Sequence, residues 1–329
     1  MRKILNWLKN IPCSRYLIIF LMNKIVISRV KNDYKKSAVE PYNALKVIIY
    51  MADGKIRCGG LSDRFRGIIS AYKLCKQMNF EFKINFSQPF KLQDYLLPNN
   101  YDWLIDNDSV SYNSNYAKPY FITSTSSVGD EKAQLFFANK YFRSNYKQIH
   151  LYTNMYFGDK EYGVLFRELF EPTDDLQALI DFNKKQIGGD YIAVVFRFQQ
   201  LLGDFKEGDY PELPKDKKDS LIGKCLELLE KIHLDNQEYR ILVTSDSTTF
   251  LSNAAKLDFI YIIPGEVVHP DYSHAIDSKV YMKSFVDYYM LSEAQKVYLV
   301  VDEIMYHSGF AYRGALHNQV PYHEISLIK

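Results

Sequence analysis

Short apolar runs alternate with segments of helical periodicity along most of the chain. Residues 45–51 (LKVIIYM) and 192–198 (IAVVFRF) are apolar at nearly every position, as expected of strands that are buried on both faces of a parallel sheet. Each run is followed by a segment in which apolar residues recur every three or four positions, the spacing of a helix. This alternation predicts an α/β fold of parallel strands and crossover helices.

The same pattern gives approximate bounds for the other elements. Further strands are expected at residues 81–86, 120–123, 148–152, 240–244, 259–263 and 297–301. Helices are expected around residues 65–75 and at 161–169, 174–186, 218–232, 246–255, 280–294 and 309–316. The Asn-, Tyr- and Pro-rich stretch at residues 87–118 is expected to be irregular, with short helices.

A length of 329 residues suits two domains, and the break Gln186-Ile187-Gly188-Gly189-Asp190 divides two α/β series. We therefore expect a basic, apolar N-terminal segment at residues 1–44, an N-terminal domain at residues 45–186 and a C-terminal domain at residues 187–329. Ligands of parallel sheets bind at the carboxyl ends of the strands. The site is therefore expected in a cleft between two Rossmann-like domains.

Charge and cysteine content exclude several classes of protein. Lys and Arg number 41 against 39 Asp and Glu, so the strong basic face of a nucleic-acid-binding protein is not indicated. The four cysteines are scattered, without a C-x-x-C pair. This spacing argues against a disulfide framework or a zinc site and favours a reducing, cytoplasmic compartment.

The N-terminal residues 1–31 combine apolar and basic side chains. The longest uncharged run, residues 16–23, is far shorter than the roughly 20 residues of a membrane-spanning helix. The preferred interpretation is a helix packed on the catalytic body. The alternative is peripheral contact with an anionic membrane surface at the inner face of the membrane.

A glycine-rich turn follows the first strand, in the stretch Arg57-Cys58-Gly59-Gly60-Leu61-Ser62-Asp63-Arg64. Glycine allows a ligand to approach the backbone closely, and the amides that open the next helix favour an anion. Gly59, Gly60 and Arg64 are thus candidate donor-binding residues. The motif is neither G-x-G-x-x-G nor a P-loop, and an ordinary turn is the alternative.

Two polar segments follow strands of the second series. Arg197 ends an otherwise apolar strand, where its guanidinium could bind a diphosphate or pair with a structural carboxylate. Ser245, Asp246 and Ser247 lie between a strand and a helix. They could bind a ligand, but capping of the helix is the preferred interpretation.

The last candidate segment joins a helix, a strand and a second helix. Asp287 lies on a mostly apolar helix, where a carboxylate needs a partner such as a guanine edge, unless it lies on the helix surface. Ser308, Gly309 and Phe310 open a helix directly after a strand, and this is a second place where amides favour an anion.

Taken in order, these segments resemble the fucosyltransferase superfamily, which includes α1,2-, α1,6- and protein O-fucosyltransferases and the bacterial nodulation-factor enzymes. The resemblance covers roughly residues 45–325. It rests on the glycine loop, on a strand ending in arginine, on a strand ending in Ser-Asp, and on an Asp-bearing helix followed by a strand and Ser-Gly-Phe. The corresponding residues are Gly59 to Arg64, Arg197, Ser245, Asp246, Asp287, Ser308, Gly309 and Phe310.

The resemblance implies a GT-B fold, GDP-fucose as donor, inversion at the anomeric carbon, and no metal or other cofactor. It implies that Arg197 holds the β-phosphate and that Asp287 contacts guanine. It also implies that Ser308 and Gly309 touch the diphosphate, with Gly59 and Gly60 nearby. Val195 stands where relatives often carry a histidine.

The absence of an Asp-x-Asp motif at a strand end agrees with a metal-free reaction, because metal-dependent glycosyltransferases use such carboxylates to hold the cation. Asp106-Asn107-Asp108 lies in the irregular stretch. The sequence thus predicts a glycosyltransferase that moves fucose to a saccharide acceptor in surface polysaccharide or glycan synthesis. The alternatives are a transferase for another nucleotide sugar and a non-catalytic nucleotide- or sugar-binding protein.

An inverting transfer needs a base for the proton of the acceptor hydroxyl. Asp204 and Glu207 follow Arg197 on one loop, and Asp204 is preferred because Gly203 frees the adjacent backbone. Asp63 in the glycine loop is second, since it could instead cap a helix. The third possibility is that the departing phosphate takes the proton.

Overall fold

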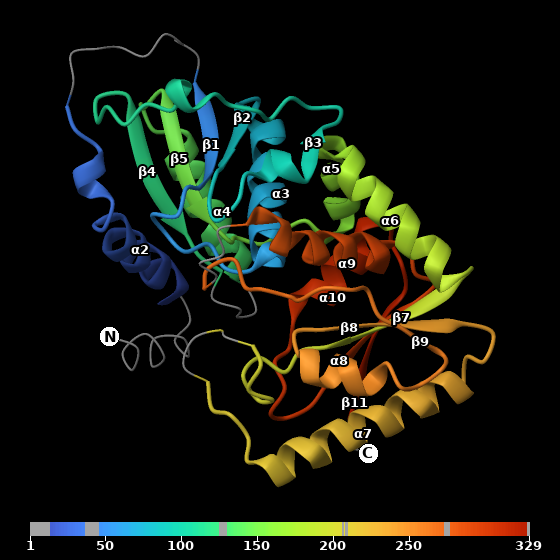
Figure 1. Cartoon of the computed structure of the whole chain (residues 1–329). Coiled ribbons are helices and arrows are strands. Elements are labelled where there is room, and N and C mark those ends of the chain that lie inside the picture. The colour runs from blue at the N-terminus through green and yellow to red at the C-terminus, as the bar shows by residue number, and fades with distance from the viewer. Residues whose placement is uncertain are drawn as a thin grey trace. The chain divides into compact units, whose positions relative to one another are not determined.

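The computed structural model describes residues 14–36, 46–124, 130–205, 207, 210–272 and 277–327. It has two compact α/β units (Figure 1). The first contains the described residues up to Leu92 together with Pro98–Glu171, and the second contains Gln93–Leu97 and the described part of Pro172–Lys329. Each unit has its own parallel sheet, which confirms the predicted fold class.

The first unit is built on a four-stranded parallel sheet in the order β2-β1-β5-β4. Its strands are β1 (Val47–Ala52), β2 (Glu81–Phe86), β4 (Ala117–Ile122) and β5 (Gln148–Thr153). Every residue of the two central strands, β1 and β5, is buried. This burial explains the uninterrupted apolar run of β1, because helices cover both faces of such sheets.

The helices of the first unit are α2 (Ser14–Ile27), α3 (Leu61–Met78), α4 (Asp130–Phe142) and α5 (Tyr162–Leu169). Helix α3 ends at Asn79, whose left-handed φ of 56° closes the helix. Helix α2 packs on β4, and the Oδ1 atom of its buried Asn23 accepts a hydrogen bond of 2.7 Å from the Phe121 amide. The packed-helix interpretation is therefore confirmed for α2, whereas residues 1–13 and 37–44 of the predicted N-terminal segment lie outside the described residues.

The second unit has a five-stranded parallel sheet in the order β11-β10-β7-β8-β9. Its strands are β7 (Tyr191–Phe196), β8 (Arg240–Ser245), β9 (Ile260–Tyr261), β10 (Val297–Val301) and β11 (Tyr322–Ser326). Its helices are α6 (Asp174–Ile187), α7 (Lys215–Leu234), α8 (Thr248–Ala254), α9 (Met282–Ser292) and α10 (Gly309–His317).

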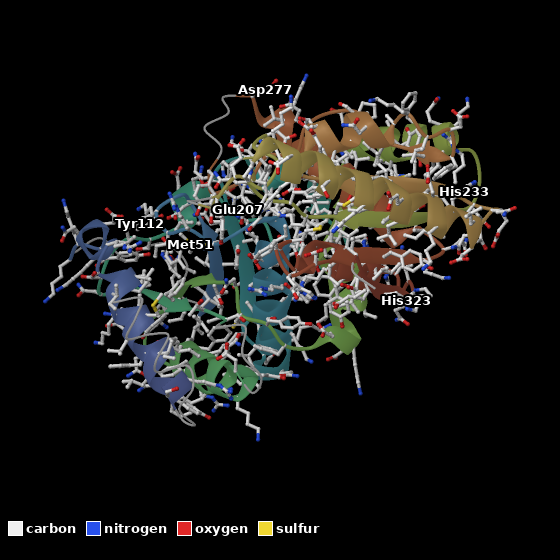
Figure 2. All side chains as sticks on the ribbon, turned by 90° about the horizontal axis from the view of Figure 1, so that it is seen from below. Met51, Tyr112, Glu207, His233, Asp277 and His323 are labelled. Atoms are coloured by element: carbon white, nitrogen blue, oxygen red, sulfur yellow. The ribbon has the colours of Figure 1, made fainter. Side chains whose placement is uncertain are left out.

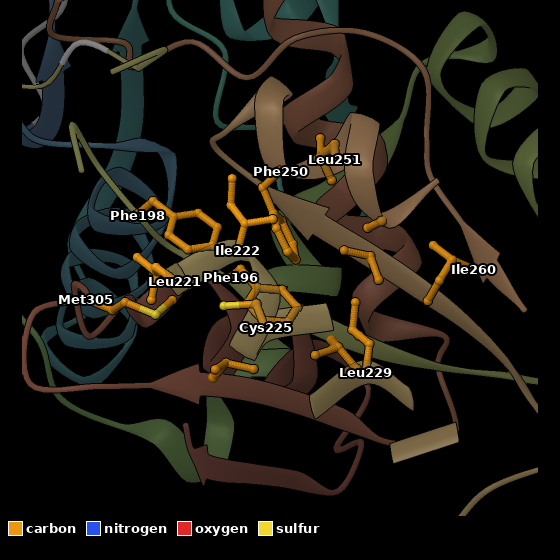
Figure 3. Packing of buried hydrophobic residues seen from close by; sticks show 14 of the residues in the cluster. Phe196, Phe198, Leu221, Ile222, Cys225, Leu229, Phe250, Leu251, Ile260 and Met305 are labelled. Atoms are coloured by element: carbon orange, nitrogen blue, oxygen red, sulfur yellow. The ribbon is translucent and has the colours of Figure 1, made fainter. Parts of the chain in front are cut away.

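A large cluster of buried apolar residues packs against one face of this second sheet (Figure 3). Phe196 and Phe198 at the end of β7 contact Phe250 of α8, with ring centroids 4.5 and 5.1 Å apart. Leu221, Cys225 and Leu229 of α7 complete the cluster at helical spacing. The cluster therefore fixes the position at which β7 ends and its loop begins.

The division between the units differs from the expected break at residues 186–190. It falls after Glu171, so α6 belongs to the second unit and the predicted domain ranges are wrong at this point. The reason is the contacts of α6, since the Tyr261 hydroxyl donates to Asn183 at 2.7 Å and Lys184 forms an ion pair with Glu293. The glycines at 188 and 189 end a helix, and a helix end need not be a domain boundary.

The short segment Gln93–Leu97 is also part of the second unit. Tyr95 stacks on Phe285 of α9 with ring centroids 4.2 Å apart and planes 1° from parallel. Its carbonyl accepts a hydrogen bond of 2.9 Å from the Thr173 amide, just before α6. Two short strands, β3 (Leu96–Pro98) and β6 (Phe170–Pro172), lie where the chain passes from one unit to the other.

The remaining elements are 3-10 helices: η1 (Lys31–Asp33), η2 (Leu92–Asp94), η3 (Asn107–Ser109), η4 (Asp159–Glu161) and η5 (Ser278–Tyr281). Two of them, η2 and η3, lie in the stretch 87–118, which has the predicted short helices but also contains β3 and the start of β4. Within the described parts of the chain, no helix is both long enough and apolar enough to cross a membrane.

Candidate active site

Two strands of the second unit end level with each other, and each is followed by a charged residue. The parallel register pairs Phe196 of β7 with Ser245 of β8, so Arg197 and Asp246 leave the sheet side by side at its carboxyl edge. The Nη1 atom of Arg197 lies 2.9 Å from the Oδ2 atom of Asp246. The structural ion pair that the sequence left open is therefore present.

Asp246 is a buried anchor for the loop that leaves β7. Its two oxygens accept hydrogen bonds from the amides of Phe198 and Gln199, at 2.9 and 2.7 Å, and Gln199 adopts a left-handed φ of 53°. Burial raises the pKa of Asp246, while the Arg197 charge and the amides act in the opposite direction. Asp246 thus fixes the guanidinium of Arg197 and does not cap a helix.

The cap of α8 is instead Ser247, whose Oγ accepts from the Phe250 amide at 3.1 Å. The capping interpretation of this segment is therefore confirmed, with Ser247 and not Asp246 as the capping residue. Ser245 is also internal, because its hydroxyl is buried and accepts from the Ser247 amide at 3.1 Å. Both observations make the end of β8 a rigid support for the loop of β7.

The other edge of the Arg197 guanidinium meets the loop that follows β7. Its Nη2 atom forms an ion pair with Glu207 (labelled in Figure 2), and the Phe205 ring lies 4.4 Å from the guanidinium carbon. The Nε2 atom of His269 lies 3.4 Å from Glu207 Oε1. Arg197 therefore sits between two carboxylates and one aromatic face.

This arrangement has an electrostatic consequence for any anionic ligand. One guanidinium cannot attract a diphosphate strongly while two carboxylates already neutralise it. Asp246 is buried and held by two amides, whereas Glu207 is only partly buried. A diphosphate that binds Arg197 must therefore displace Glu207 and leave Asp246 in place.

Asp204, the preferred base, is engaged at the start of α8. Its Oδ2 atom accepts from Ser247 Oγ at 2.8 Å, Thr248 Oγ1 at 3.2 Å and the Thr249 amide at 2.6 Å. Burial would raise the pKa of Asp204, but these hydrogen bonds outweigh it and lower the pKa. A carboxylate stabilised as an anion by three donors is a weak base, so these contacts favour a structural role.

A third segment joins the same carboxyl edge through the loop between β10 and α10. The Tyr306 amide donates to the Arg197 carbonyl at 3.2 Å, which ties this loop to the end of β7. Two residues later, Ser308 caps α10 by accepting from the Phe310 amide at 3.2 Å. Arg197 and the start of α10, with Gly309 as its first residue, are thus brought together.

Asp287 is buried within α9 and does not lie on the helix surface. Both of its oxygens are 2.9 Å from the Nζ atom of Lys283, one turn earlier, and Lys283 is buried as well. Burial raises the pKa of Asp287, and the Lys283 charge opposes this shift. The partner that the sequence analysis expected for the Asp287 carboxylate is therefore Lys283 of the same helix.

The glycine loop of the first unit is held from inside by Arg64. This buried side chain donates to the carbonyls of Gly59 and Gln88, both at 3.0 Å, and its guanidinium lies 4.9 Å from the Phe86 ring. Gly59 has a φ of 89°, and a Cβ there would lie 2.5 Å from an Asp63 oxygen. Arg64 therefore shapes the loop, and Gly60 forms the N-cap position of α3.

Asp63, the second candidate base, lies in the first turn of α3 and pairs with Arg66 at 3.0 Å. The N-cap position of α3 is Gly60, and the Asp63 carboxylate lies next to Gly59 in the loop before the helix. Its half-exposed carboxylate belongs to the first unit, whereas Arg197, Asp246, Ser308 and Gly309 gather at one edge in the second.

The sequence interpretation missed three side chains at this edge and in α9. Lys283 stands four residues before Asp287, a spacing that by itself indicates a helical ion pair. His269 and Tyr306 carry no such signal, because they lie in loops whose paths the sequence does not determine. Among the residues that the structure describes, no group of three or more His, Cys, Asp or Glu side chains is placed to hold a metal ion.

Neither a protein-family model nor a curated protein matches the sequence. Solved structures do match. NodZ α-1,6-fucosyltransferase soaked with GDP-fucose aligns with a TM-score of 0.54 at 12% identity, over 85% of this chain and 95% of that one. Fucosyltransferase NodZ from Bradyrhizobium gives 0.52 at 11% identity over 83% and 92%. A mutant of Arabidopsis thaliana FUT1 in complex with GDP gives 0.53 at 13% identity over 94% and 78%. The chain therefore has the GT-B fold of these fucosyltransferases.

Proposed function

We propose that the chain is an inverting glycosyltransferase that transfers fucose from GDP-fucose to a saccharide acceptor without a metal ion. An acceptor oxygen forms a bond to the anomeric carbon, the bond from that carbon to the β-phosphate oxygen breaks, and GDP leaves with the electron pair. The acceptor proton passes to a base. We place the reaction in the cytoplasm, in the synthesis of a surface polysaccharide or glycan.

The observation that carries this proposal is the position of Arg197. It leaves β7 at the carboxyl edge of a parallel sheet, is fixed by the buried Asp246 and is tied to the loop that opens α10. A guanidinium and helix amides together can neutralise the charge that grows on a departing diphosphate. In this role Arg197, Ser308 and Gly309 bind the diphosphate, and no cation is required.

Glu207 is the base that the geometry supports best. Its carboxylate pairs with Arg197, and diphosphate binding would release it beside the reacting phosphate. Without Arg197, the contacts of this carboxylate with His269 and Gln199 are long, at 3.4 and 3.5 Å, so it can accept the proton of the acceptor hydroxyl. Asp204 lacks this freedom because three donors hold it. Asp63 stays the candidate from the first unit.

Fewer groups are available to recognise the nucleobase of the donor than the resemblance to fucosyltransferases implies. Val195 is buried in β7 and offers no polar atom, and Asp287 already has Lys283 as its partner. Tyr306 is 45% exposed beside Arg197, and an exposed ring next to a diphosphate site can stack on any nucleobase. For this reason a transferase for another nucleotide sugar is the second candidate function.

Two measurements test the proposal. Binding of GDP should raise the melting temperature of the protein more than UDP or NAD at the same concentration. Mass spectrometry of reactions with GDP-fucose and a panel of oligosaccharides should then detect a fucosylated product, in EDTA as well as in Mg²⁺. GDP binding without transfer to any acceptor would favour a non-catalytic binding protein. A product that forms only after Mg²⁺ or Mn²⁺ is restored would contradict the metal-free mechanism.

A further inference from the structure

The outward face of α2 is apolar although it is exposed. The inward face carries the buried Ile18, Ile19 and Val26 against the first unit. A surface helix of this kind normally has a polar outer face. Here Tyr16, Leu17 and Phe20 are instead 38%, 46% and 40% exposed, and Figure 2 shows side chains projecting along this helix.

Helix α4 extends this apolar surface. Phe136 is 52% exposed, and its ring meets the Tyr16 ring edge to face, with centroids 5.4 Å apart. Phe136 also contacts the buried Phe137 behind it, so its position is supported by the core. Tyr16, Leu17, Phe20 and Phe136 therefore form one surface across two helices, which we call the α2–α4 face.

Exposed cations surround this face. The Nζ atom of Lys24 lies 5.6 Å from the Phe20 ring, and the exposed Lys132 and Lys140 stand one turn before and after Phe136 on α4. Glu131 is an exposed acid nearby on α4. On α2 the charges are of one sign, since residues 14–27 contain Arg15 and Lys24 and no Asp or Glu.

The charge pattern extends along the sequence on both sides of α2. The first acidic residue of the whole chain is Asp33, and the basic residues before it are Arg2, Lys3, Lys9, Arg15, Lys24, Arg29 and Lys31. A two-fold dimer through the α2–α4 face would bring these like charges toward their own copies. An anionic surface would instead be attracted to them.

We propose that the α2–α4 face docks on an anionic lipid bilayer. Aromatic side chains prefer the headgroup region, where an apolar ring and a polar edge are both accommodated. Lysines at the margin reach the phosphates with their charged ends while their stems stay on the apolar surface. The contact is peripheral, and it is independent of what the second unit binds.

The test is sedimentation of the full-length protein with vesicles. Vesicles of phosphatidylcholine with 30% phosphatidylglycerol, a composition set for the test, should bind the protein, and binding should weaken in high salt. Phe20→Glu should lower the partition coefficient by at least about tenfold, because it removes a ring that would be buried in the bilayer and adds a charge that anionic lipid repels. Phe182→Glu is the matched control, since Phe182 is also an exposed helical phenylalanine, on α6 in the other unit.

A second variant tests the α4 half of the face. The tryptophan emission of Phe136→Trp should shift to the blue with anionic vesicles and stay unchanged with pure phosphatidylcholine, relative to the unsubstituted protein. Equal binding to neutral and anionic vesicles would overturn the proposal. So would an equal loss in Phe182→Glu, or a dimer that Phe20→Glu dissociates without any vesicle binding by the parent protein.

Discussion

At the scale of single residues, the proposed function gives Arg197 two roles that can be separated by substitution: it pairs with Asp246 and it binds the diphosphate. Arg197→Ala would remove the ligand contact and also leave the buried Asp246 without its cation, which is strongly destabilising. Arg197→Lys keeps a charge for Asp246 but cannot bridge that carboxylate and a phosphate, because an ammonium is a compact point charge.

We therefore expect Arg197→Lys to melt close to the parent protein and to transfer fucose at least about a hundredfold more slowly. The measurement is kcat for transfer from GDP-fucose, with the melting temperature recorded beside it. Arg240→Lys is the control, because it makes the same exchange at the start of β8. Normal turnover by Arg197→Lys would remove Arg197 from the reaction.

The two acidic residues of the β7 loop should behave differently. Glu207→Gln should reduce kcat by about a hundredfold or more, since an amide cannot accept the proton. It should not weaken GDP binding, because the Glu207 carboxylate competes with the diphosphate for Arg197. Asp204→Asn should mainly lower stability by about 1 kcal/mol through loss of charged hydrogen bonds. The opposite result, a dead Asp204→Asn and an active Glu207→Gln, would restore Asp204 as the base.

Tyr306 is expected to contribute affinity for the nucleoside alone. Tyr306→Ala should raise the Kd for GDP by about tenfold, in the range of one base–aromatic stack, and leave the Kd for inorganic pyrophosphate unchanged. Ile304→Ala on the same loop removes a similarly exposed apolar side chain without a ring and should change neither. Calorimetric titration of the three proteins decides this, and equal losses for both ligands would make Tyr306 a support of the loop.

At the scale of elements, α9 contains a buried ion pair that the rest of the helix cannot replace. Asp287→Ala would leave the Lys283 ammonium buried without a counter-charge, at a cost of about 3–5 kcal/mol. We expect a large fall in the urea midpoint, and Lys283→Met combined with Asp287→Leu should recover much of it. If the double variant is as stable as the parent protein and still binds GDP normally, Asp287 does not contact guanine.

The elements that the sequence predicted share a clear physical signal. Strand β10 was predicted with its observed ends, because five apolar residues lie between polar neighbours. Helix α4 was missed because its apolar residues do not lie on one face, with Phe136 exposed beside the buried Phe137. Strand β11 was missed because YHEIS at a sheet edge is half polar and mostly exposed.

Only those parts of the candidate site that follow directly from the ends of strands could be predicted from the sequence. Arg197 and Asp246 could be expected at one edge, because parallel strands end there together. Their pairing with each other depends on the level register of β7 and β8, and register is a tertiary property. The hydrogen bonds to Asp204 come from Ser247, Thr248 and Thr249 at the start of α8, 43 to 45 residues later in the chain. No local sequence pattern predicts that the loop carrying Asp204 lies against this helix.

At the scale of the whole molecule, His150 links stability to pH. Its ring is fully buried in β5, between the Tyr34 hydroxyl at 2.7 Å and Gln148 Oε1 at 3.1 Å. Burial, with a smaller contribution from Lys55, lowers the pKa of His150 from 6.5 to about 3. The unfolded chain therefore binds a proton that the folded protein excludes, so stability is complete above pH 6.5 and falls as the pH drops toward 3.

The expected loss from this histidine is about 1.4 kcal/mol per pH unit below 6.5. His150→Gln keeps one donor and one acceptor but does not titrate. Urea unfolding at pH 7 and pH 5 should thus show a smaller loss of stability for the variant than for the parent protein. The same pH dependence in both proteins would mean that His150 is already protonated in the folded state.

The segment Gln93–Leu97 determines whether the second unit can be produced as a separate fragment. These five residues lie in the chain between the two parts of the first unit and supply Tyr95, whose ring stacks on Phe285 and whose carbonyl accepts from the Thr173 amide. A fragment that begins at residue 172 would lack Tyr95. The Phe285 ring would lose its stacking partner, and the Thr173 amide before α6 would lose its acceptor. The second unit therefore cannot be separated from the first by a single cut, and a minimal version of it would need Gln93–Leu97 joined to it through a new linker.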